Sequence, residues 1–95
     1  MNKEKIVSII KEAFEDFAET EGLNININDN TSLMGSNSVI DSLGLVTLLV
    51  DVESRLADED IEMSIISEKA MSQKNSPFIN VNSLAEYIAE QIKQD

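Results

Sequence analysis

The first twenty residues place apolar side chains at the spacing of an amphipathic helix. The inward positions are Ile6, Ile10, Phe14 and Phe17, with Val7, Ala13 and Ala18 beside them. This period of 3.6 residues predicts a helix over about residues 3–20 with one buried face. Gly22 follows it and favours a helix end there, because glycine readily adopts the left-handed backbone conformation that closes helices.

A long irregular connection is predicted next. Residues 23–28 alternate apolar and polar like a strand, but no second strand-like run exists with which they could pair, so we expect an extended, anchored loop. Asn, Ser, Thr and Gly dominate residues 29–41, where Leu33 and Met34 are the expected inward anchors. A loop of this length in a small domain is unusual and is often functional.

The second half of the chain predicts three further helices. The first covers about residues 42–57, with Asp41 as its N-cap. A short or irregular helix is expected over about residues 64–72. Pro77 prevents this helix from continuing further. The last covers about residues 80–93 and is capped by Asn80 or Asn82. Its inward residues are Val81, Leu84, Ile88 and Ile92, with Tyr87 beside them. The sequence therefore predicts one all-α domain over residues 1–95, a four-helix bundle.

The predicted helix over residues 42–57 is apolar on two faces. One continuous face is expected to be core and consists of Leu45, Leu48, Leu49, Val52 and Leu56. A narrower second stripe consists of Leu43, Val46 and Val50. A helix in a monomeric bundle needs only one buried face, so the stripe is either covered by the short third helix or left for a partner. The pattern alone favours neither.

Composition narrows the function classes. The chain has no cysteine, which excludes disulfides and thiol catalysis and fits a reducing compartment. It also has no histidine. Its net charge of −11 disfavours nucleic acid and anionic lipid and favours basic partners. Residues 36–68 hold eight acids against Arg55 alone, which indicates either a solvated surface or a docking face. No signal peptide or membrane span is expected, and the protein is expected to be cytoplasmic.

The acidic turn after the second helix does not predict a metal site. Asp58, Asp60 and Glu62 match the first, third and fifth positions of an EF-hand loop. Met63 stands where that loop requires glycine, and Lys69 stands where it requires a bidentate glutamate.

Ser42 has the most distinctive chemical setting in the chain. It opens the second predicted helix, where backbone N–H groups and the helix dipole favour a phosphate. Without histidine, and with few lysines, no neighbour is expected to activate its hydroxyl as a nucleophile, so modification is a better interpretation than catalysis. A serine at a helix start is by itself more often a capping or first-turn residue.

The segment Asp41-Ser42-Leu43, with flanks from Val39 to Val46, resembles the attachment site of acyl carrier proteins. That family has a long first helix, a long loop, Asp-Ser-Leu at the start of helix two, a short helix three and a last helix that reads like residues 81–88. All of these occur here in order, and residues 30–33 resemble the family's loop segment. The resemblance covers almost the whole chain and implies the family's four-helix bundle.

By position, the resemblance implies that Ser42 receives phosphopantetheine from coenzyme A through a phosphopantetheinyl transferase. The thiol of that arm would hold an acyl or aminoacyl group as a thioester. Asp41 would help to orient the transferase complex, and Leu43, Val46, Val50 and Glu53 would bind partners. These partners would be acyl- or aminoacyl-loading ligases, and acyltransferases or synthases with basic docking patches. The chain itself would be a monomer and not an enzyme.

Some positions differ from a common fatty-acid carrier. Gly44, Thr47 and Ser54 stand where such carriers often have acids, and the region over residues 63–78 is longer. These differences indicate a specialised carrier for a dedicated lipid or metabolite pathway. The alternative is a small acidic protein-interaction module without a prosthetic group.

Overall fold

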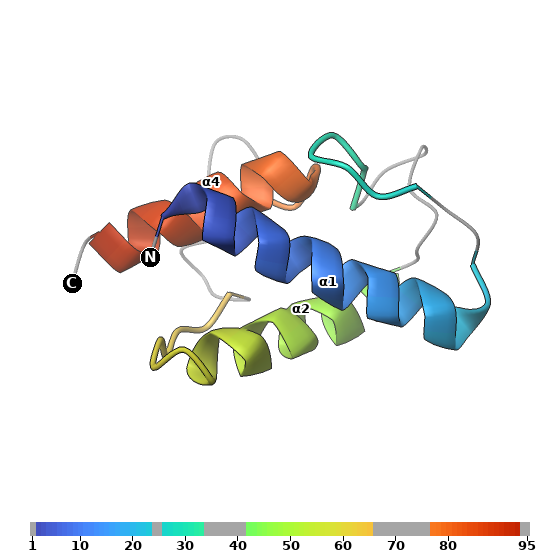
Figure 1. Ribbon diagram of the computed structural model, residues 1–95, viewed down its shortest axis with the longest axis horizontal. Helices are drawn as coiled ribbons and strands as arrows, with labels where there is room; N and C mark the ends of the chain where they lie inside the picture. Colours follow the sequence, from blue (N-terminus) through green and yellow to red (C-terminus); the bar gives the residue numbers. More distant parts are fainter. Residues whose placement is uncertain (1, 24–25, 34–41, 66–76, 94–95) are drawn as a thin grey trace.

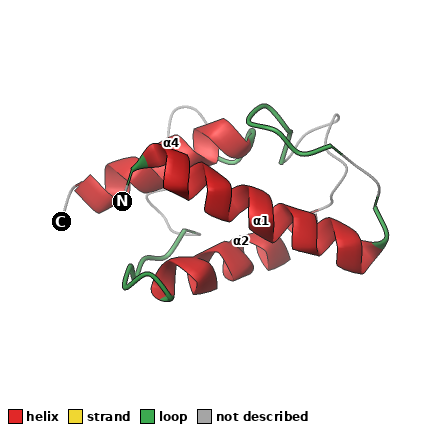
Figure 2. Ribbon diagram, viewed as in Figure 1, coloured by secondary structure: helices red, strands yellow, loops and turns green. Residues whose placement is uncertain are grey.

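The computed structural model describes residues 2–23, 26–33, 42–65 and 77–93. These ranges contain three helices, α1 (Lys3–Glu21), α2 (Ser42–Ala57) and α4 (Val81–Lys93), and no strand (Figure 2). The all-helical class is thus confirmed, and the three observed helices agree with the predicted bounds to within one residue. The helix predicted over residues 64–72 falls almost entirely outside the described residues, and residues 61–65 are not helical. Within the described ranges, three helices rather than the predicted four are therefore observed.

Both ends of α1 are closed by local hydrogen bonds. At the start, the side chain of Asn2 accepts a hydrogen bond of 2.9 Å from the backbone N–H of Lys5. At the end, Gly22 adopts φ +71°, and the N–H groups of Gly22 and Leu23 donate to the carbonyls of Glu19 and Ala18. This pair of bonds satisfies carbonyls that a helix end leaves without partners, and it confirms the predicted stop at Gly22.

Helix α1 packs against both α2 and α4 and lies between them in Figure 1. Among the described residues, α2 and α4 have no close backbone contact with each other, so α1 joins them. The buried core residues of the three helices are Ile6, Ile9, Ile10, Ala13, Phe14, Ala18, Leu48, Leu49, Val52, Leu56, Val81, Leu84, Ala85, Tyr87 and Ile88. Phe17, Leu45 and Ile92, predicted to be inward, pack against this core but are only partly buried.

The loop over residues 26–33 contains a turn, in which the N–H of Thr31 donates to the carbonyl of Asn28 at 3.1 Å. It is anchored through Leu33, as predicted, but its partner was not predicted. Leu33 is fully buried, and its N–H donates to the carbonyl of Ile79 at 3.0 Å. The N–H groups of Val81 and Asn82 donate to the carbonyls of Thr31 and Asp29 at 3.2 and 2.8 Å. The loop is thereby held against the start of α4. Met34, the other predicted anchor, lies outside the described residues.

Asn80 is the N-cap of α4. Its side-chain oxygen accepts from the N–H of Ser83 at 2.8 Å, and the Ser83 hydroxyl accepts from the N–H of Asn80 at 3.0 Å. This reciprocal pair satisfies two backbone donors at the helix start. Of the two asparagines that the sequence offered as caps, the structure therefore uses Asn80.

Four basic side chains are described, and each forms an ion pair that connects α1 to another part of the chain. Lys3 pairs with Glu86 on α4 at 3.2 Å, Lys5 with Glu59 at 3.5 Å, and Lys11 with Asp29 at 2.7 Å. The fourth is Arg55, which extends from α2 to Asp16 and Glu12 on α1 and also pairs with Asp51 on its own helix. The hydrogen bond with Asp16 is the largest cause of the raised pKa of Arg55, with Asp51 adding to it.

We expect Arg55→Met to lower the free energy of unfolding by about 1 kcal/mol, because Glu12, Asp16 and Asp51 then face one another without a cation. The measurement is urea denaturation at low salt and at 1 M NaCl, where screening should shrink the difference between variant and wild type. Lys5→Met removes the ion pair of Lys5 with Glu59, which is more exposed than Arg55, and serves as the control. It should lower the free energy of unfolding by less than Arg55→Met. An Arg55→Met loss that is independent of salt would contradict an electrostatic role.

Candidate functional site

Helix α2 carries the predicted site residues other than Asp41. Ser42 is the first residue of this helix. Asp41, the predicted cap and second cofactor-binding residue, lies outside the described residues. Next to Ser42, Leu43 is 74% exposed, and along the same face Val46 and Val50 are 45% and 56% exposed. These three residues, called the apolar stripe below, are therefore not part of the core.

The exposure of the apolar stripe follows from how α2 packs. Successive residues of a helix are rotated by about 100°, so Leu43, Val46 and Val50 share one side. The residues on the side of α2 that faces α1 are buried in the core, and they are Leu48, Leu49, Val52 and Leu56. Ile79, before α4, is the other large apolar side chain that is exposed among the described residues, at 48%. Three such side chains in one row on α2 mark a surface that suits a partner.

Thr47 follows Val46 of the apolar stripe in the sequence. Its hydroxyl donates to the carbonyl of Leu43 at 3.0 Å, one turn earlier in the same helix. This hydrogen bond is typical of threonine within helices. The Thr47 side chain is exposed, and it presents its methyl group and hydroxyl oxygen without adding charge beside the stripe.

Glu53, predicted to bind partners, has a contact that the sequence did not reveal. Its carboxylate accepts a hydrogen bond of 2.5 Å from the backbone N–H of Ile65, whose side chain is fully buried. Glu53 therefore fastens the end of residues 61–65 to α2, and its side chain is only partly exposed. Helical periodicity gives no signal for this bond, because the two residues are twelve positions apart and meet only after the chain reverses.

The chain reverses direction in the acidic turn after α2, at residues 58–60. The N–H groups of Asp60 and Ile61 donate to the carbonyls of Ala57 and Leu56 at 3.0 and 2.9 Å, and Asp60 adopts φ +65°. Asp58, Glu59, Asp60 and Glu62 are all exposed. Over the described residues, no group of three or more acidic side chains is arranged to hold a metal ion.

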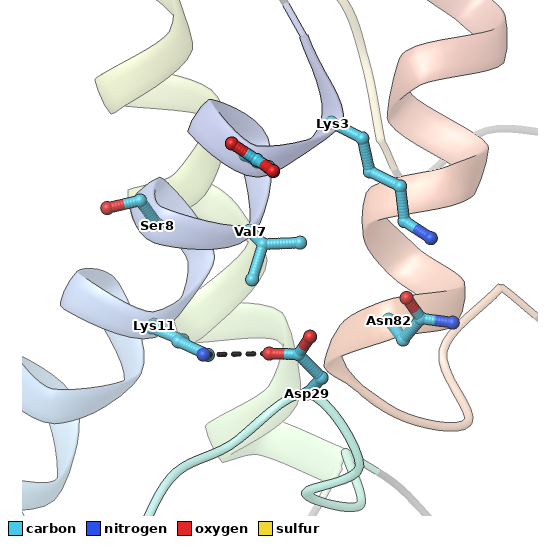
Figure 3. A pocket seen from close by; sticks show the side chains of 7 residues that line it. Lys3, Val7, Ser8, Lys11, Asp29 and Asn82 are labelled. Carbon is cyan, nitrogen blue, oxygen red and sulfur yellow. Dashed lines mark ion pairs between the residues drawn. The ribbon is translucent and has the colours of Figure 1, made fainter.

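At least two surface hollows lined by described residues border α1. The larger, of about 470 Å³, lies between α1, Asp29 and the start of α4, and Figure 3 shows Lys3 and Lys11 at its edges. Both lysines are paired with carboxylates, so the hollow has little net charge to attract an ion. The smaller, of about 200 Å³, lies between α1 and α2 and includes Thr47.

None of the helices in the described ranges has both the length and the apolar character that crossing a membrane requires. Comparisons of this chain with protein-family models, with curated proteins and with solved structures give no match. The assignment of a function therefore depends on the residues and on their arrangement.

We expect Glu53→Ala to release residues 61–65 from α2 and to lower the free energy of unfolding by about 1–2 kcal/mol, because the buried N–H of Ile65 loses its acceptor. Amide hydrogen exchange at Ile65 measures this directly and should accelerate. Glu53→Gln keeps a side-chain oxygen at the same position and should retain most of the protection. Equal exchange rates at Ile65 in Glu53→Ala and wild type would show that the bond does not hold the segment.

Proposed function

We propose that this protein is a carrier that holds an acyl or aminoacyl group on a phosphopantetheine arm attached to Ser42. The observation that carries the proposal is the apolar stripe, which begins at the residue after Ser42 and stays exposed although α2 already has a complete buried face. A group attached to Ser42 would thus be presented beside a surface that a partner can cover. The resemblance of Asp41-Ser42-Leu43 and of the element order to acyl carrier proteins supports the same function.

The start of α2 suits a phosphodiester. The first N–H groups of a helix have no acceptors within the helix, and the helix dipole is positive at this end. Ser42 is the first residue of α2 and would be the attachment point, with Asp41 preceding it. In the attachment reaction the Ser42 hydroxyl gives up its proton to the solvent and its oxygen forms a bond to the phosphorus next to pantetheine. The pyrophosphate bond of coenzyme A breaks, and adenosine 3′,5′-bisphosphate leaves. The bound arm supplies a thiol that forms the thioester.

The surface charge supports a shuttle that binds its partners briefly. A net charge of −11 accelerates encounters with basic surfaces, and a small apolar contact allows rapid release. The partners would be a phosphopantetheinyl transferase, a loading ligase, and acyltransferases or synthases that carry basic patches. The protein would act in the cytoplasm as a monomer and would itself catalyse nothing, since it has no histidine or cysteine.

The carrier would be a specialised one, and its complete fold would include the short third helix of a four-helix bundle. Common fatty-acid carriers often have acidic residues at the positions of Gly44, Thr47 and Ser54, and this chain lacks them. The carboxylate of Glu53 already accepts a hydrogen bond from the N–H of Ile65. The acidic patch beside the apolar stripe is therefore thinner than in a common fatty-acid carrier. This favours dedicated partners in a lipid or metabolite pathway.

The second candidate is a small acidic interaction module that carries no prosthetic group. The apolar stripe on its own supports the interaction module as well as it supports the carrier, since any protein partner could cover it. The two functions differ at Ser42, which only the carrier requires as a hydroxyl.

We expect incubation with coenzyme A and a phosphopantetheinyl transferase of broad specificity to add one phosphopantetheine group to the folded protein. Intact-mass spectrometry measures the addition. Ser42→Ala should abolish it, whereas Ser54→Ala, an exposed serine on the same helix, should not. An unchanged mass for the folded wild type would refute the carrier function and favour the interaction module.

A further inference from the structure

The hollow between α1 and α2 has an apolar floor and an acidic rim. Ala13 and Leu48 are buried at its base, with the partly buried Phe17 beside them. Its carboxylates are Asp16, Glu21 and Asp51. The volume of about 200 Å³ is below the roughly 300–1,000 Å³ of typical small-molecule sites, so it suits one side chain better than a whole cofactor.

The rim of this hollow keeps a negative charge despite the nearby arginine. The rim has three carboxylates, and Arg55 pairs with two of them, Asp16 and Asp51. Set against this one guanidinium, the three carboxylates leave a net charge of about −2. An apolar floor with such a rim matches a lysine or arginine side chain, which packs its aliphatic stem on apolar surface and keeps its charged end near carboxylates and water.

The hollow is continuous with the apolar stripe. Thr47 borders the hollow and lies four residues after Leu43, to whose carbonyl its hydroxyl donates. Asp51 also borders the hollow and lies four residues after Thr47. Because residues four apart on a helix are only about 40° apart, one partner surface can cover the stripe and reach the hollow together.

We propose that the hollow between α1 and α2 receives a lysine or arginine side chain of the partner protein that covers Leu43, Val46 and Val50. A second copy of this chain is a poor occupant, because both copies carry the same excess of negative charge and each of the four described basic side chains is already in an ion pair. The role of that partner in loading or unloading cargo rests on the carrier function proposed above. Binding of a cationic side chain in the hollow does not.

The test is an NMR titration of the unmodified protein with n-butylguanidinium, which reproduces the stem and charge of arginine. The changes in amide chemical shift should be largest at Ala13, Phe17, Thr47 and Leu48. They should reach a plateau as the concentration of n-butylguanidinium rises. n-Butanol, which has the stem without the charge, should bind more weakly. Shifts that spread over the acidic surface without saturating, or equal binding of n-butanol, would overturn the proposal.

A pair of variants tests the location. Thr47→Arg places a cation at the edge of the hollow and should weaken n-butylguanidinium binding about fivefold, the size expected of an exposed charge pair. Ser54→Arg makes the same change of charge on an exposed position of α2 outside the hollow and should weaken it less than about twofold. Equal weakening by both variants would show that net charge, rather than the hollow, attracts the probe. Because no step uses Ser42, these outcomes are independent of the phosphopantetheine test.

Discussion

Helix α1 holds the described parts of this molecule together, because α2 and α4 both pack against it and have no close backbone contact with each other. Its side chains Ile6, Ile10, Ala13 and Phe14 are fully buried in the core that joins the three helices. Ion pairs extend from the same helix to α2, to α4, to Asp29 in the loop and to Glu59 in the turn after α2. In a chain with few basic residues, these internal pairs leave the outward surface strongly acidic.

The central position of α1 also explains why α2 has an exposed apolar face. One side of α2 is buried in the core that α1 completes, and among the described residues no other helix packs on its opposite side. Residues 61–65 turn back along α2 but are fastened at Glu53, and they leave Leu43, Val46 and Val50 largely exposed. Stability of the fold and accessibility of the stripe are thus compatible. A carrier whose partners must bind and leave requires such a surface.

The helices were predictable because their signals are local. The apolar period of α1, the stop at Gly22 and the bounds of α2 follow from neighbouring residues, and the structure confirms them. The core face of α2 was also predicted, but only packing decided that the second apolar face, the apolar stripe, is left exposed. The pairing of residues 29–33 with residues 79–82 was missed because the second segment has no strand pattern. The bonds of Glu53 with Ile65 and of Arg55 with Asp16 depend on tertiary structure, which periodicity does not encode.

The account depends most on the claim that the apolar stripe of α2 lies outside the core, and two matched substitutions test it. Val52 is fully buried, Val50 is 56% exposed, and the two residues lie in the same helix two positions apart. Denaturant unfolding should show that Val52→Ala lowers the free energy of unfolding by about 2 kcal/mol, whereas Val50→Ala changes it by less than about 0.5 kcal/mol. A loss for Val50→Ala as large as that for Val52→Ala would show that the stripe is core and would contradict its role as a surface for partners.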